Sequence, residues 1–190
     1  MFTSQKIVDL ADAFRMWLPH CGGVTPEQIV LVQESFAQVV PIADTAAALF
    51  YGRLFEMDPT LRALFRADMR AQYRNLMQTL TVVVRGLDRL DSILPAVEAL
   101  GRRHAGYGVK DEHFQVVGEA LLWTLQQGLG QAFTPEVRQA WATAYGLLAR
   151  TMKDSLSQAS VRAARARPLA SDRQDVRGLR GQTALKPAAT

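Results

Sequence analysis

The chain has 190 residues, of which 48% are hydrophobic, so it is long enough to form one domain with a buried core. The formal net charge is +4, but the basic excess lies from residue 158 onward, where seven basic residues stand against two acidic ones. The body therefore lacks the basic character of a nucleic-acid-binding surface. A lone cysteine, Cys21, excludes an internal disulfide, and no apolar run is long enough to span a membrane. The N-terminal residues carry acids and do not resemble a secretory signal, so we expect a cytoplasmic protein.

Helix signals recur along the chain, whereas alternating strand patterns and hairpin turns are almost absent. The stretch TPEQ at residues 25–28 places a capping threonine before a proline, with a glutamine three residues after the cap. Asp58 and Thr134 also precede a proline and give the same start signal. Between these signals the apolar residues recur every three or four positions. We predict helices at about residues 5–18, 26–40, 42–57, 59–65, 69–86, 93–105, 111–129 and 134–157.

Two terminal segments differ from this all-α body, which we place at residues 25–157. Residues 1–24 form an amphipathic extension that either docks on a partner or a second subunit, or packs on its own domain. Residues 158–190 are rich in Pro, Gly, Arg and Ala, so we expect a basic, disordered tail into which the last helix continues for a few residues. We interpret this tail as solvated rather than as a contact for nucleic acid or a membrane. Cys21 is interpreted as a bystander thiol, with the intersubunit disulfide of a homodimer as the alternative.

One of the three histidines, His104, continues an apolar helical stripe that includes Val97 and Leu100. Burying an imidazole is costly unless its nitrogens are used, so two readings are open. His104 is either a satisfied core residue or a metal ligand, and the carbonyl of Leu100, one turn back, is a suitable acceptor for one ring nitrogen. The other two, His20 and His113, have the pattern of surface or capping residues.

Two further polar side chains fall on apolar helix faces. Tyr51 shares the face of Phe50 and Leu54, and Gln72 lies one turn before Leu76. A buried hydroxyl and a buried amide each need a hydrogen-bond partner. They could satisfy each other or a water molecule, but this explanation is less natural for three polar groups, His104 included, on converging faces.

At this point the chain resembles the globin family, in particular neuroglobin, the single-domain bacterial haemoglobins and the haem domain of flavohaemoglobins. The segments LFYGRLFEMDPTLRALF, LGRRHAGYGV, FQVVGEALLWTL and AFTPEVRQAWATAYGLLA carry the resemblance, which covers about residues 25–157. The resemblance implies an all-α globin fold, the three-on-three helical sandwich, and haem b (iron protoporphyrin IX) as the cofactor. Globin-fold sensor domains without haem lack the proximal histidine, so its presence here disfavours that reading.

The resemblance also implies roles for individual residues. His104 would be the proximal iron ligand, and Tyr51 and Gln72 would stabilise a gas ligand on the distal side. We expect the remaining haem contacts from Phe65, Leu76, Leu100, Val109, Phe114, Arg103 and Tyr107. Glutamine is a poor ligand for ferrous haem, so the iron is expected to be five-coordinate.

Three classes of function follow from the resemblance: reversible binding of O₂ and of NO or CO, oxidation of nitric oxide, and gas sensing. We favour reversible binding over an enzyme. Nitric oxide dioxygenase activity would need a separate reductase, because no dinucleotide-binding fingerprint is present. Flavohaemoglobins place a tyrosine and a glutamate behind the proximal histidine, whereas the matching positions here are Phe114 and Leu156, which accept no proton.

Overall fold

The computed structural model describes residues 23–65 and 68–166, with side chains as far as Gln158. Every regular element in these two ranges is a helix, which confirms the all-α prediction. The predicted helix at residues 5–18, His20, Cys21 and the tail from residue 167 lie outside the described part of the chain. The elements, in chain order, are α2 (Pro26–Val39), η1 (Val40–Ile42), α3 (Ala43–Met57), η2 (Pro59–Leu64), α4 (Met69–Arg85), η3 (Leu87–Arg89), α5 (Leu90–Gly106), α6 (Asp111–Leu129), η4 (Gly130–Ala132) and α7 (Pro135–Ala166).

The predicted start signals form real caps. The backbone N–H of Gln28 donates to Thr25 Oγ1 at 3.3 Å, and the Gln28 side chain accepts from the Thr25 backbone at 3.1 Å. Asp58 accepts from the Thr60 backbone at 2.9 Å, and Thr134 accepts from the backbone of α7. Each bond satisfies a donor that the first helical turn leaves without a partner.

Three element boundaries differ from the prediction. The segment at residues 59–65 forms a 3₁₀ helix, η2, rather than an α-helix. Helix α5 begins at Leu90, three residues before the predicted start, because Leu90 packs against the main core. Pro95 therefore lies inside the helix, although proline has no backbone N–H to donate. Helix α7 continues past residue 157 to Ala166, through a segment rich in Ala and Arg, both good helix formers. This continuation agrees with our expectation that the last helix extends into residues 161–167.

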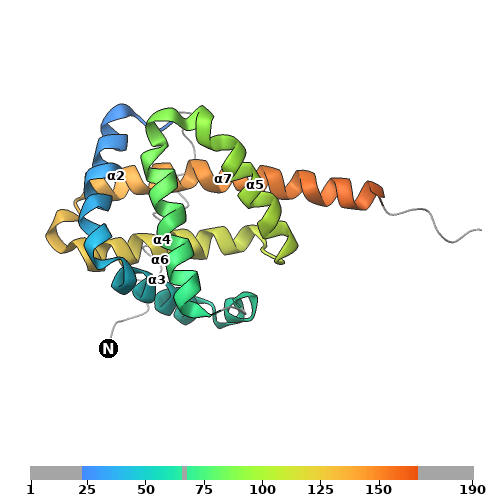
Figure 1. Ribbon diagram of the computed structural model, residues 1–190, viewed down its shortest axis with the longest axis horizontal. Coiled ribbons are helices and arrows are strands. Elements are labelled where there is room, and N and C mark those ends of the chain that lie inside the picture. The colour runs from blue at the N-terminus through green and yellow to red at the C-terminus, as the bar shows by residue number, and fades with distance from the viewer. Residues whose placement is uncertain (1–22, 66–67, 167–190) are drawn as a thin grey trace, which may run out of the picture.

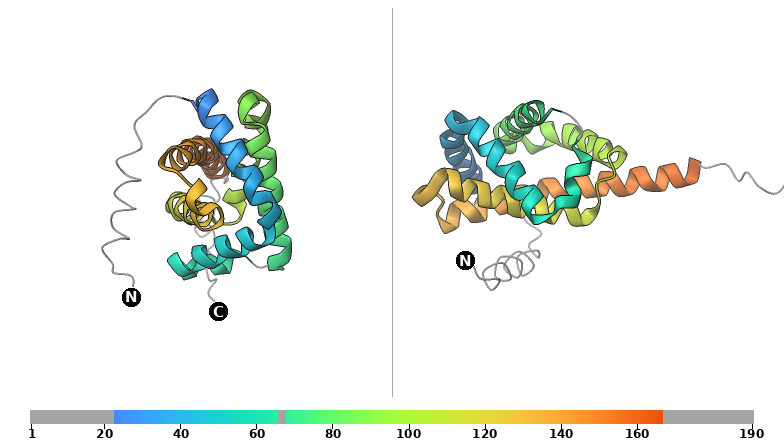
Figure 2. Two further views of the ribbon diagram at one scale, coloured as in Figure 1. Left: turned by 90° about the vertical axis from the view of Figure 1, so that its left-hand side faces the viewer. Right: turned by 90° about the horizontal axis from the view of Figure 1, so that it is seen from below.

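The helices form two crossed layers. Helices α6 and α7 run across the molecule, and α2, α4 and α5 cross over them (Figure 1). Helix α5 packs most extensively on α7, α3 on α6, and α2 on α7. The left view of Figure 2 shows α6 and α7 nearly end-on, with α2 and α4 along one side of them. With α3 beside α6, this is the three-on-three arrangement that the resemblance implies.

A buried polar contact fixes the packing of α2 on α7. The indole N–H of Trp141 donates to Ser35 Oγ at 2.9 Å, and the Trp141 ring lies 6.2 Å from that of Phe36. Ser35 Oγ in turn donates to the carbonyl of Leu31. Because every polar atom of this contact has a partner, the two helices can bury their apolar faces without leaving a donor unsatisfied.

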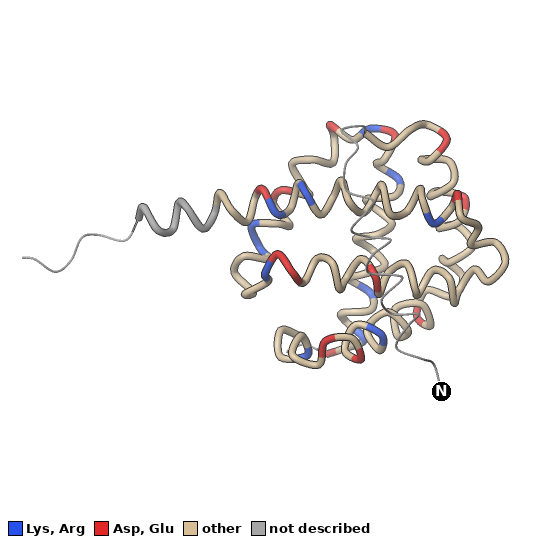
Figure 3. Tube along the Cα trace, turned by 180° about the vertical axis from the view of Figure 1, so that it is seen from behind, with Lys and Arg blue, Asp and Glu red and all other residues tan. Residues whose placement is uncertain are grey.

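Charged residues are interspersed on the helices. Figure 3 shows basic and acidic positions alternating over the described helices without a long stretch of one sign. No helix in the described ranges is both long enough and apolar enough to cross a membrane.

Candidate functional site

His104 lies in the last turn of α5 and is half-buried. Its Nδ1 is 2.8 Å from the carbonyl oxygen of Leu100, the acceptor expected from the sequence. A carbonyl can only accept, so Nδ1 carries a proton in this contact. In the neutral ring this arrangement leaves the lone pair on Nε2, which is then the nitrogen available to a metal.

The position of His104 depends on a close approach of α5 to α7 at Gly101. A Cβ placed on Gly101 would lie 2.8 Å from the carbonyl oxygen of Met152 and 3.1 Å from the Cβ of Ser155. Only glycine allows the two backbones to come this close without a shift. Since His104 follows Gly101 by three residues on the same helix, this contact sets the depth of its side chain.

A small apolar cluster adjoins the end of α5. Its buried members are Phe114, Ala149 and Leu156, and the partly buried residues against it are Ala105, Val109, Tyr145 and Met152. The Tyr145 hydroxyl donates to the carbonyl oxygen of Phe114 and so ties α7 to α6. Phe114 and Val109, which we expected near His104, both belong to this cluster, and Leu100 is half-buried on α5.

Tyr51, Phe65 and Leu76 belong to the other, larger apolar cluster. Tyr51 is buried, with 5% of its surface exposed. Its ring packs edge-to-face with that of Phe65, and the two ring centroids are 5.3 Å apart. Gln72 is half-buried in the second turn of α4, one turn before Leu76. Tyr51 and Gln72 do not hydrogen-bond each other in the structure, so the simplest alternative explanation for these two polar groups is not realised.

Several apolar side chains near the two clusters are only half-buried. On α4 these are Tyr73, Leu76, Leu80 and Val83, and elsewhere they are Val109 before α6, Val117 on α6 and Leu148 on α7. Apolar side chains between packed helices are normally covered completely. An apolar group held against these side chains would complete their burial.

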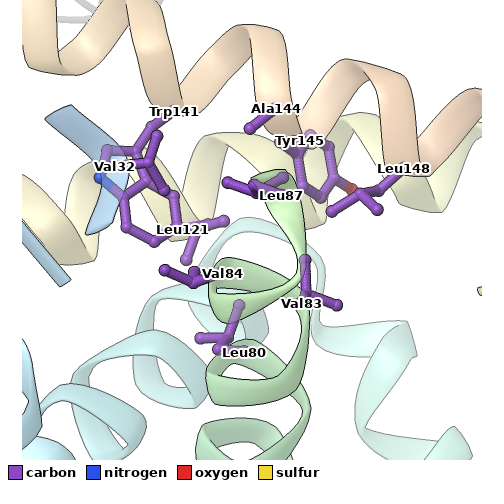
Figure 4. A pocket seen from close by; sticks show the side chains of 10 residues that line it. All are labelled: Val32, Leu80, Val83, Val84, Leu87, Leu121, Trp141, Ala144, Tyr145 and Leu148. Atoms are coloured by element: carbon purple, nitrogen blue, oxygen red, sulfur yellow. The ribbon is translucent and has the colours of Figure 1, made fainter. Parts of the chain in front are cut away.

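A small apolar cavity of about 30 Å³ lies one turn beyond Leu76, between α2, α4, α6 and α7. Its lining residues are Val32, Leu80, Val83, Val84, Leu87, Leu121, Trp141, Ala144, Tyr145 and Leu148 (Figure 4). The Trp141 indole N–H and the Tyr145 hydroxyl already donate to Ser35 Oγ and to the Phe114 carbonyl, so neither has a donor left for a water molecule. A cavity of this kind favours a small apolar molecule over water.

The other two expected site residues, Arg103 and Tyr107, lie at the C-terminal end of α5 and are exposed. The rings of Tyr107 and His104 pack edge-to-face, with their centroids 6.0 Å apart. His113 is a capping residue, as predicted, because its Nδ1 accepts from the Lys110 backbone at 3.1 Å.

The donor set around His104 identifies the kind of metal group that fits. Among the described residues, no three His, Cys, Asp or Glu side chains gather as a metal cage would require. A single imidazole next to an apolar cluster matches an iron whose other ligands belong to a macrocycle. The residues present therefore fit haem.

Two residues that shape the site were not singled out in the sequence. The residues around Gly101 do not predict its role, because the residue that approaches it, Met152 on α7, lies about fifty positions later in the chain. Tyr73, on α4, stacks on Tyr51 at 5.6 Å with an angle of 24° between the rings. Its spacing of three and four residues from Leu76 and Met77 marks it as an inward residue but does not reveal its partner.

Burial, and to a lesser extent the charge of the neighbouring Tyr73 phenol, raises the pKa of Tyr51 from 10.0 to about 12. Burial also raises the pKa of Tyr145. Both shifts favour the neutral phenol in the folded state, so their stabilisation is complete below pH 10 and is lost as the pH rises from 10 toward 12. We expect the guanidinium unfolding midpoint to fall over this range, and to fall less in Tyr51→Phe. A midpoint that stays constant up to pH 12 would contradict this expectation.

The sequence matches one protein family and several of its members. Residues 48–152, more than half of the chain, match the family model described as Globin. The chain is 32% identical over 141 residues to the Flavohemoprotein of Bacillus subtilis, covering 68% of this chain and 35% of that protein. It is also 32% identical over 129 residues to the Flavohemoprotein of Rhodopirellula baltica, covering 66% of this chain and 32% of that protein. The chain thus spans about a third of the length of these relatives.

Two solved structures are similar in fold. One is an engineered carbene transferase derived from a provisionally assigned nitric oxide dioxygenase of Rhodothermus marinus. It has a TM-score of 0.68 and 26% identity, and the match covers 74% of this chain and 99% of that one. The other is a hexacoordinated heme protein from an anhydrobiotic tardigrade, with a TM-score of 0.64 and 16% identity, covering 70% of this chain and 95% of that one. The chain belongs to the globin family, and its cofactor is haem b.

Proposed function

We propose that this globin binds O₂ reversibly, and NO and CO at the same place, with His104 as the proximal ligand and Tyr51 and Gln72 on the distal side. The observation that carries the proposal is the state of His104, whose Nδ1 bond to the Leu100 carbonyl leaves Nε2 as the ligand atom. When bound, the haem would supply a ferrous iron able to take one diatomic gas.

The apolar side chains would hold the group and keep water away from it. Phe65 and Leu76 would line one side, while Leu100, Val109 and Phe114 would line the other. Arg103, exposed near the end of α5, would pair with a haem carboxylate. The exposed Tyr107 lies nearby, with its ring centroid 6.0 Å from that of His104.

Tyr51 is the principal hydrogen-bond donor to the gas. Its raised pKa of about 12 keeps the hydroxyl protonated throughout the neutral range, so it can always donate. A hydrogen bond to a partly charged acceptor contributes about 1.5–3 kcal/mol, which is roughly a 10- to 100-fold slower dissociation. The half-buried amide of Gln72 is the second donor.

Tyr51→Phe removes this hydroxyl and keeps the ring. We expect the O₂ dissociation rate, measured by stopped-flow displacement with CO, to rise by about 10- to 100-fold. Gln72→Leu is expected to raise the rate less, and Gln78→Leu, an exposed glutamine on the same helix, is expected to leave it unchanged. An unchanged rate in Tyr51→Phe would refute the donor role.

Oxidation of nitric oxide is the second candidate, and the likeness to the Rhodothermus marinus protein favours it. It would require electrons from a separate reductase. The surroundings of His104 argue for reversible binding instead, because Nδ1 bonds a neutral carbonyl and the nearby cluster consists of apolar residues such as Phe114 and Leu156. A carboxylate partner would make the imidazole more electron-donating. Sustained nitric oxide consumption with an added reductase and NADH would favour the second candidate.

A further inference from the structure

Four aromatic rings enclose the ring of Tyr51. The rings of Phe50, Phe55 and Phe65 lie at 5.1, 5.9 and 5.3 Å, at angles of 81°, 38° and 77°. The fourth ring, that of Tyr73, lies at 5.6 Å and is nearly parallel, at 24°. Phe50 and Phe55 belong to the same helix as Tyr51, and Phe65 follows η2. Tyr73 is the one ring of this group on α4, the helix that also carries Gln72.

No described residue hydrogen-bonds the hydroxyl of Tyr51, so no polar contact of the protein fixes its direction. The direction of the O–H group therefore depends on how the ring is packed. Edge-on and stacked neighbours restrain a ring from different directions. A nearly parallel neighbour covers one face of the ring, so the ring cannot turn toward that side. Among the four rings, Tyr73 is the neighbour that lies nearly parallel to Tyr51 and supplies this restraint.

We propose that Tyr73 is a positioning residue that stacks on Tyr51 and holds its hydroxyl toward the gas site. This inference rests on the proposed role of Tyr51. The sensitivity of the Tyr51 pKa to charge on Tyr73 supports the closeness of the two phenols. Because Tyr73 follows Gln72 directly on α4, the stack also sets the placement of the two distal donors relative to each other.

A double-mutant cycle on the haem-loaded full chain tests this role. Tyr73→Leu removes the stacked ring, and we expect it to raise the O₂ dissociation rate about three- to tenfold, which an aromatic pair can account for. Tyr73→Phe keeps the stacked ring, so we expect its O₂ dissociation rate to equal that of the wild type. In the Tyr51→Phe background, Tyr73→Leu should cause no further increase.

The infrared C–O stretching band of the CO-bound protein supplies a second readout, since it responds to the direction of a nearby O–H dipole. The band is expected to broaden or shift in Tyr73→Leu and to stay at its wild-type position in Tyr73→Phe. Guanidinium unfolding of each variant separates this effect from a general loss of stability.

The outcomes distinguish the two claims. If Tyr51→Phe raises the rate but Tyr73→Leu does not, the positioning role is wrong and the donor role stands. If Tyr73→Leu raises the rate equally with and without the Tyr51 hydroxyl, Tyr73 acts independently and the inference is also wrong. If Tyr51→Phe itself has no effect, the donor role fails, and the positioning role fails with it.

Discussion

His104→Ala is expected to abolish stable haem binding. The variant removes the imidazole whose Nδ1 is held by the Leu100 carbonyl and whose Nε2 we assign as the ligand atom. Substitutions that merely disturb a metal ligand from outside commonly cost 10–100-fold in affinity, so removal of the ligand itself should cost more than about 100-fold. The Soret absorbance that remains with the purified protein after gel filtration measures the loss.

His113→Ala is the matched control, because this histidine caps α6 and contacts the Lys110 backbone rather than the candidate site. It is expected to retain a full complement of haem. His104→Gly with added imidazole offers a second check, since free imidazole can replace the missing ring and should restore the Soret band. Full haem retention by His104→Ala would contradict the assignment of the proximal ligand.

Gly101→Val is expected to destabilise the fold and the haem site together. The new side chain would collide with the backbone of Met152 and with Ser155, and α7 cannot yield there without moving its neighbours. Overpacking of this kind typically costs about 1–3 kcal/mol or more. The end of α5 would move away from α7 and carry His104 with it. We therefore expect a lower guanidinium unfolding midpoint and faster haem loss to an excess of serum albumin.

Gly146→Ala provides the comparison, because no atom lies within 4 Å of a Cβ placed at this helical glycine. Alanine favours the helix by about 1 kcal/mol over glycine, so this variant should be as stable as the wild type or slightly more stable. A normal midpoint and normal haem retention in Gly101→Val would show that the close contact of α5 and α7 does not position His104.

Local signals predicted the features that depend on a few neighbouring residues. The Thr25, Asp58 and Thr134 caps are confirmed, because a cap needs only a side chain and the next few amides. The acceptor for His104 was predictable for the same reason, since the Leu100 carbonyl lies one helical turn back. The resemblance added the order of helices and hence the fold.

Features that depend on distant segments were not predictable from the sequence. Helix α5 begins three residues early because Leu90 packs on the core, and this packing outweighs the proline that follows. Gly101 allows close packing because the backbone of Met152 on α7 approaches it. Tyr73 on α4 stacks on Tyr51, which belongs to a different helix, α3. In each case the helical periodicity identifies the inward face of a helix but not the residue that the face meets.

The most direct test of the account is the visible absorption spectrum of the haem-loaded ferrous protein, recorded without gas and then with CO and with O₂. The account predicts a five-coordinate spectrum without gas, because Tyr51 and Gln72 are donors rather than strong iron ligands, and its full conversion by either gas to a stable bound form. A six-coordinate ferrous spectrum without gas would mean that a side chain of the chain occupies the gas site. That result would contradict the proposed function.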